Sequence, residues 1–137
     1  MRILLDPADV ATVQEPRFRD LLQLRFEQIC DGEPFDPVTM ARFVIVEPGD
    51  TVAEIEAGSG AWITTSMFDE ARYGDPDFSP CFDFLEFHDL EVRVYEFVTI
   101  TSDSGFGIAL FIQDLPGMDE ELMRFCREYA QPAAETV

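Results

Sequence analysis

Residues Glu91 to Gln113 read EVRVYEFVTITSDSGFGIALFIQ, and they determine the expected architecture more than any other segment. From Val92 to Ile100, β-branched and aromatic residues occur at both odd and even positions. Because alternate residues of a strand point to opposite faces, this pattern is typical of a strand with apolar side chains on both faces. Ser102-Asp103-Ser104-Gly105 has the composition of a turn, and Phe106 to Ile112 form a second apolar run. The segment therefore predicts a long antiparallel hairpin over about residues 91–113, at the centre of a sheet.

A helix is predicted on each side of this hairpin along the chain. The first runs from about Pro16, at the first-turn position that proline favours, to Cys30, and Asp31-Gly32 ends it. The last begins near Asp119 and has one apolar face. The apolar surface of the first helix is wider than one face, which is typical of a helix that packs against a sheet or another subunit. The stripe of the first helix consists of Phe18, Leu21, Leu22, Arg25 and Ile29.

Shorter elements are predicted nearer the amino terminus. Ile3 to Leu5 suggest an opening strand, and the apolar run from Phe43 to Val46 predicts a buried strand. Thr51 and Glu54 have the spacing of a capping box, so a short helix is expected to begin there. Gly58-Ser59-Gly60 is expected to end that helix.

Together these elements predict an α+β fold in one domain. The 137 residues have the length of a single domain, and a hydrophobic content of 47%, with 13 Phe, supplies a core. We expect an antiparallel sheet centred on the hairpin at about 91–113, with the first and last helices packed on one of its faces. The domain is expected to span residues 1–131, with a frayed tail at 132–137.

The charge balance limits the classes of partner. The chain has 28 acidic residues against nine basic ones, for a net charge of −19, and every basic residue is Arg. A field of this sign repels phosphates, so direct binding to nucleic acid and anchoring to an anionic membrane are both disfavoured. The same field attracts a basic protein partner. The alternative that the acidity confers only solubility, or reflects a halophilic host, stays open.

The cysteines and the start of the chain indicate a reducing cytoplasm. Cys30, Cys81 and Cys126 are far apart in the sequence and form no C-x-x-C pair, so neither a disulfide framework nor a structural zinc site is expected. Met1 is followed by only a short apolar run before Asp6, unlike a signal peptide. No run approaches the length of a membrane span. We therefore expect a cytoplasmic protein.

The acidity is concentrated in the middle of the chain. Between Glu47 and Glu91 there are twelve acids against Arg72 alone. Within this segment, residues 68–87 have no regular pattern and are expected to form a long functional loop. Its phenylalanines either anchor the loop in the core or form an aromatic ridge among acids, as in many interface hot spots. The partner-binding candidates are Asp75, Asp77, Phe82, Asp83, Phe84 and Glu86.

A small-ligand pocket is the alternative use of residues 73–89. Its candidates are Trp62, Tyr73 and His88, the last being the only histidine of the chain. The window from Asp75 to Glu86 has oxygen ligands at calcium-loop spacing, but Pro80 occupies the position of the required glycine, so we expect no calcium or other metal there. Without a nucleophile motif, a G-x-G-x-x-G or a P-loop, no catalytic residue and no cofactor are predicted.

Three short motifs carry a resemblance to known proteins. Val46-Glu-Pro-Gly-Asp-Thr51, Tyr73-Gly-Asp-Pro-Asp-Phe78 and Asp103-Ser-Gly-Phe-Gly-Ile108 together resemble a set of small bacterial proteins of uncharacterised function. Members of that set often travel on plasmids and integrating elements. The likeness covers about residues 43–130. It implies an accessory protein of a mobile element and transfers no activity and no site residue.

The leading hypothesis is therefore a non-enzymatic protein whose acidic surface binds a basic protein partner. In one version it is an inhibitor that occupies a nucleic-acid-binding site by imitating the charge of its ligand. The alternative is a small-ligand or metal-binding module that uses residues 73–89. An enzyme with paired carboxylates ranks third, because acids alone assign no general acid or base. A homo-oligomer remains open, since the first helix is apolar on more than one side.

Overall fold

The structure is a computed structural model and describes residues 1–37, 40–61, 84–100 and 107–132. Within those ranges, three α-helices, one 3-10 helix and six strands follow one another along the chain. Their bounds are β1 Arg2–Leu4, η1 Pro7–Thr12, α1 Pro16–Cys30, β2 Ala41–Val46, α2 Val52–Ser59, β3 Phe84–Asp89, β4 Arg93–Ile100, β5 Gly107–Gln113, α4 Glu120–Tyr129 and β6 Gln131–Pro132.

The predicted hairpin forms the centre of the sheet. β4 and β5 pair antiparallel from Val94 opposite Gln113 to Ile100 opposite Gly107. The strand order is β1-β2-β5-β4-β3-β6, so the two hairpin strands take the middle positions. The α+β class and the central hairpin are confirmed.

The sheet is mixed, however, and not wholly antiparallel. β2 runs parallel to β5, and β6 runs parallel to β3, while β1 with β2 and β3 with β4 pair antiparallel. A parallel pair needs a long crossover in the chain, which leaves no turn signal in the sequence. The prediction of a fully antiparallel sheet was wrong because alternation within a segment identifies a strand but not its neighbour.

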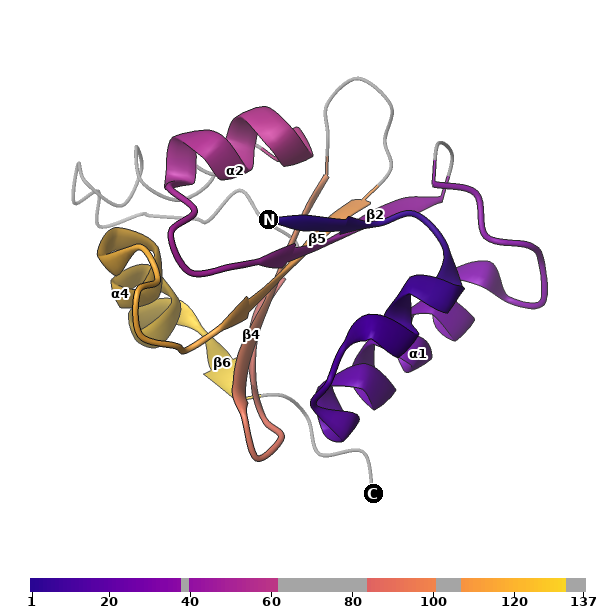
Figure 1. The fold of residues 1–137 in the computed structure, drawn as a ribbon, viewed down its shortest axis with the longest axis horizontal. Helices are drawn as coiled ribbons and strands as arrows, with labels where there is room; N and C mark the ends of the chain where they lie inside the picture. Colours follow the sequence, from indigo (N-terminus) through magenta and orange to yellow (C-terminus); the bar gives the residue numbers. More distant parts are fainter. Residues whose placement is uncertain (38–39, 62–83, 101–106, 133–137) are drawn as a thin grey trace.

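The helices cover both faces of the sheet, which corrects the prediction that the first and last helices share one face. Figure 1 shows the sheet between α1 on one side and α2 and α4 on the other. Along β2, Phe43 and Ile45 belong to the core under α1, whereas Val44 and Val46 belong to the core under α2 and α4. Both faces of the central strands are apolar, so each face needs its own cover.

A second difference concerns the segment before the hairpin. Residues 68–87 were expected to be irregular, but Phe84 to Asp89 form β3, paired with β4 from Phe84 opposite Val98 to Asp89 opposite Arg93. The acids and prolines of the preceding stretch pointed to a loop, and pairing with β4 overrides that local preference. At the turn between the two strands, Glu91 has a positive φ of 72°.

The helix ends agree with the sequence. α1 spans Pro16–Cys30, and Asp31 ends it in the left-handed conformation. The Thr51 hydroxyl accepts the N–H of Glu54 at the start of α2. Gly60, with φ of 80°, terminates α2 as predicted.

The stripe predicted for α1 is only partly buried. Phe18, Leu21 and Leu22 lie in the core, but Ile29 is 41% exposed. Phe26, which is not one of the stripe residues, is buried and packs edge-on against Phe35 and Phe43. The carboxyl-terminal end of α1 therefore turns a different side toward the sheet than the stripe suggested.

None of the described helices meets the requirements for crossing a bilayer. The longest, α1, has 15 residues. A helical span needs about 20 predominantly apolar residues. This agrees with the expectation that the chain has no helical membrane span in its described parts.

Candidate functional site

Most of the predicted site residues lie outside the described residues. This holds for two pocket candidates and four partner-binding candidates: Trp62, Tyr73, Asp75, Asp77, Phe82 and Asp83. Phe84 is the first residue of β3. The two remaining candidates, Glu86 and His88, also lie on β3, two residues apart. They were assigned to different hypotheses, and the structure places them together.

The strand register gives these two side chains a third partner. Glu86 lies opposite Glu96 of β4, and His88 lies opposite Val94. Side chains two apart on a strand share a face, and directly opposed residues on neighbouring strands do too. Glu86, His88 and Glu96 therefore point to the same side of the sheet. Val94 belongs to the core under α1, which identifies that side as the one that α1 covers.

Arg25 of α1, the helix that covers this side of the sheet, contacts Glu96. Its Nε donates to Glu96 Oε2 at 2.7 Å and its Nη2 donates to Glu96 Oε1 at 2.8 Å, a bidentate pair. The Nε2 atom of His88 lies 2.9 Å from the same Oε1. A carboxylate oxygen of Glu86 lies 3.9 Å from His88 Nε2. We call Arg25, Glu86, His88 and Glu96 the Glu96 cluster.

Two side chains of the Glu96 cluster are buried, and the other two are partly exposed. The side chains of Glu96 and His88 are 1% and 9% exposed, whereas those of Arg25 and Glu86 are 22% and 32% exposed. A cavity of about 510 Å³ opens beside it. Arg25, Glu86 and Glu96 line this cavity together with apolar residues such as Phe43 and Val98. A molecule or ion entering the cavity therefore meets two carboxylates and an apolar wall.

The charges of Arg25 and Glu96 stabilise each other. Burial raises the pKa of the Glu96 carboxyl, but hydrogen bonding with His88 and Arg25 and the charge of Arg25 outweigh it, so the pKa is lowered. The hydrogen bonds to Glu96 raise the pKa of Arg25, against the effect of burial. Glu96 is thus a carboxylate at neutral pH, held by a fully charged guanidinium.

Two members of this cluster were missed from the sequence as site residues. Arg25 was assigned to the apolar stripe of the first helix, and Glu96 interrupts the apolar face made by Val94 and Val98. A charge inside an apolar pattern costs free energy unless it is paired. Two such charges of opposite sign, one on a helix and one on a strand, would have predicted their contact.

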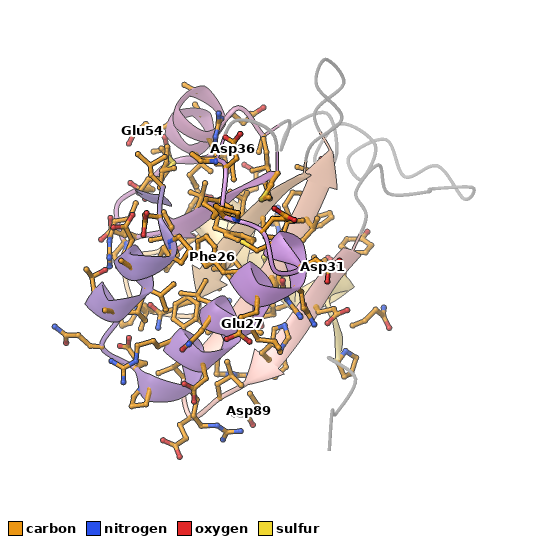
Figure 2. The ribbon with its side chains drawn as sticks, turned by 90° about the vertical axis from the view of Figure 1, so that its right-hand side faces the viewer. Phe26, Glu27, Asp31, Asp36, Glu54 and Asp89 are labelled. Carbon is orange, nitrogen blue, oxygen red and sulfur yellow. The ribbon has the colours of Figure 1, made fainter. Side chains whose placement is uncertain are left out.

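A separate acidic surface lies at the carboxyl-terminal end of α1. Glu27, Asp31 and Glu33 are exposed there, and Asp36 follows in the next loop. Figure 2, which looks at the side on which α1 lies, shows Glu27, Asp31 and Asp36 on that side. No arginine occurs between Phe26 and Ala41, and the last turn of α1 has no basic residue. We call Glu27, Asp31, Glu33 and Asp36 the α1 acidic end.

Comparison with protein-family models, with curated proteins and with solved structures finds no match to this chain. The Glu96 cluster and the α1 acidic end are the two features of the described residues that bear on function. One is a buried polar group beside a cavity, and the other is an exposed surface of one charge.

Proposed function

We propose that this protein is a non-enzymatic binding protein that uses an acidic surface to associate with a basic protein partner. The observation that carries the proposal is the α1 acidic end. Three exposed carboxylates, those of Glu27, Asp31 and Glu33, gather where the helix already has its negative pole. Carboxylates in this position destabilise a helix, so a cation from outside is favoured there.

Four of the described arginines contact groups other than the carboxylates of Glu27, Asp31 and Glu33. Arg25 is engaged with buried Glu96, and Arg127 pairs with Asp114. Arg42 and Arg19 donate to the backbone carbonyls of Ser59 and Val13. Among the described residues, no ion pair involves the carboxylates of Glu27, Asp31 or Glu33.

In the more specific form of this proposal, the protein imitates nucleic acid and occupies the binding site of a nucleic-acid-binding protein. The net charge of −19 favours fast association with such a surface. The resemblance to small proteins of plasmids and integrating elements suggests a cytoplasmic accessory role in which such a partner is encountered. Asp75, Asp77 and Asp83, the acidic candidates from the sequence, lie outside the described residues.

The test compares two variants with the same change in charge. Glu27→Gln, Asp31→Asn and Glu33→Gln remove three charges from the α1 acidic end. Glu54→Gln, Glu120→Gln and Glu128→Gln remove three charges from α2 and α4, on the other face of the sheet. Wild type and both variants are used to capture partners from cells of the native host, and association rates are then measured at several salt concentrations.

We expect the captured partner to be basic, and its association rate to fall as salt rises, because exposed charges are screened over about 8–10 Å at physiological ionic strength. The α1 variant should lose most of the association rate, and the α2/α4 variant should keep it. An acidic partner, or equal losses in the two variants, would contradict the proposal. In the nucleic-acid-mimic version, duplex DNA displaces the protein from its partner.

A second candidate, a small-ligand or metal-binding module using residues 73–89, has one supporting observation. Glu86, at the carboxyl-terminal end of that segment, lines a cavity together with Glu96, and His88 Nε2 lies 2.9 Å from Glu96 Oε1.

A further inference from the structure

Glu86, His88 and Glu96 bring three potential metal-ligand atoms into one place. One imidazole nitrogen and one carboxylate oxygen from each glutamate lie within 4.8 Å of one another. The atoms come from two paired strands near the middle of the sheet, so their backbone positions are set by the ladder of β3 and β4. Such a frame holds ligands more precisely than a loop does.

The separations suit a small tetrahedral ion. Zinc binds imidazole nitrogen and carboxylate oxygen at about 2.0–2.2 Å, so two ligand atoms of a tetrahedral site lie about 3.3 Å apart. His88 Nε2 lies 2.9 Å from Glu96 Oε1 and 3.9 Å from the nearest Glu86 oxygen. The first distance must open and the second must close by about half an ångström, and the third separation, between the Glu86 and Glu96 oxygens, lies within 4.8 Å and must also close toward that spacing.

Arg25 has the place of an outer-sphere partner. It holds both oxygens of Glu96 through Nε and Nη2, which orients the carboxylate toward His88. Carboxylates that bind metals are commonly fixed by hydrogen bonds of this kind. The cavity of about 510 Å³ lies on the open side of the cluster and leaves room for water or another ligand at a fourth position.

We propose that Glu86, His88 and Glu96 form a binding site for one divalent transition-metal ion, with Zn²⁺ as the best match. Imidazole nitrogen with two carboxylates suits first-row transition ions, whereas Ca²⁺ and Mg²⁺ prefer oxygen ligands alone. The Glu96 cluster has two carboxylates and only one guanidinium, which favours a cation. This proposal differs from our expectation of no metal, and it does not depend on the proposal of a basic partner.

The experiment uses the whole chain, stripped of metal with a chelator. Zn²⁺ is titrated by calorimetry, and Co²⁺ is titrated by visible absorption, at about 0.15 M salt and with excess Mg²⁺. We expect one ion per chain and the d–d bands of a low-coordinate Co²⁺ site. No thiolate-to-cobalt charge-transfer band should appear, because the proposed ligands include no cysteine.

Variants locate the ion. His88→Gln and Glu86→Gln should each weaken Zn²⁺ binding, His88→Gln more strongly, whereas Arg25→Met should weaken it by about 10- to 100-fold as an outer-sphere change. Asp89→Asn and Glu91→Gln are the matched controls, because both residues are exposed; Asp89 is the last residue of β3, and Glu91 lies in the turn that follows. These two should bind Zn²⁺ as wild type does. Circular dichroism confirms that each variant is folded.

Three results would overturn the site. Equal affinities in His88→Gln and the wild type would mean that other carboxylates hold the ion. A thiolate band would place Co²⁺ at a cysteine. Zn²⁺ binding that excess Mg²⁺ abolishes would identify nonspecific attraction by the acidic surface. None of these outcomes bears on capture of a basic partner, so the two proposals fail separately.

Discussion

Glu96 shows what a single charged residue does inside this sheet. Its side chain is 1% exposed and has two partners, Arg25 from α1 and His88 from β3. A buried carboxylate is tolerated only when its oxygens are hydrogen-bonded. The pair therefore ties the helix to the central strands at one position, and it leaves little freedom in how α1 lies on the sheet.

Removing the charge of Glu96 should destabilise the fold. We expect Glu96→Gln to lower the free energy of unfolding by about 3 kcal/mol, the lower part of the range for breaking a buried pair, because Arg25 can partly turn to solvent. Urea unfolding in the presence of a chelator measures this change in the free energy of unfolding. Glu91→Gln, an exposed control, should change stability by about 0.5 kcal/mol or less.

The double variant Arg25→Met/Glu96→Met tests whether the two side chains stabilise the fold as a pair. Replacing both partners with apolar side chains removes the unpaired charge, so its cost should be clearly smaller than the sum of the two single replacements. Additive losses would mean that Arg25 and Glu96 stabilise the fold independently of each other.

Cys126 provides a second prediction at this scale. The side chain is 0% exposed, and burial raises the pKa of its thiol to about 12. Since the thiolate is the nucleophile, Cys126 should resist iodoacetamide at pH 8 in the native protein and react only on unfolding. Mass spectrometry after a short pulse reads out each cysteine, and half-buried Cys30 serves as the internal comparison. Native labelling of Cys126 as fast as that of Cys30 would contradict the burial.

At the scale of elements, α4 depends on its first residues. Asp119 Oδ1 accepts the N–H of Leu122, and Glu120 and Glu121 follow in the first turn. On the side of α4 that faces the sheet, Leu122 and Phe125 are buried. Charge at the start and apolar residues along one side thus favour the same helix.

Removing this cap should have a measurable and limited effect. Asp119→Ala should destabilise the protein by about 1 kcal/mol, because the N–H of Leu122 loses its acceptor. Asp119→Asn keeps an acceptor and should cost clearly less. Thermal unfolding of both variants tests this. Equal losses would show that the charge of Asp119, and not its hydrogen bond, stabilises the start of α4.

For the whole molecule, the dominant quantity is the net charge of −19. Self-repulsion of this size opposes the compact state. The Debye length falls from about 30 Å at 0.01 M salt to about 3 Å at 1 M, so added salt should weaken the repulsion. The buried Arg25–Glu96 pair is screened less than exposed charges are.

NaCl should therefore stabilise the fold. We expect Tm to rise between about 0.01 M and 1 M NaCl. In a domain of this size, a gain of about 1 kcal/mol in the free energy of unfolding raises Tm by about 4 °C. The variant lacking the charges of Glu27, Asp31 and Glu33 should start from a higher Tm at low salt and gain less. A fall of Tm with salt would mean that ion pairs outweigh repulsion.

The sequence by itself determined the elements whose signals are local. The alternation from Val92 to Ile100 and the turn residues after it predicted β4 and β5, and Pro16 with Asp31-Gly32 bounded α1. In each case the deciding residues are neighbours in the chain, so the pattern and the structure that it specifies lie in the same window. The α+β class followed from these elements.

Only the tertiary structure decided how the elements meet. It placed α1 and α4 on opposite faces, paired β2 parallel with β5, and drew Phe84 to Asp89 into the sheet. It also joined Arg25 to Glu96 across 71 positions of sequence and set His88 beside them. These contacts depend on which faces are buried together, and burial is a property of the packed molecule that no single segment specifies.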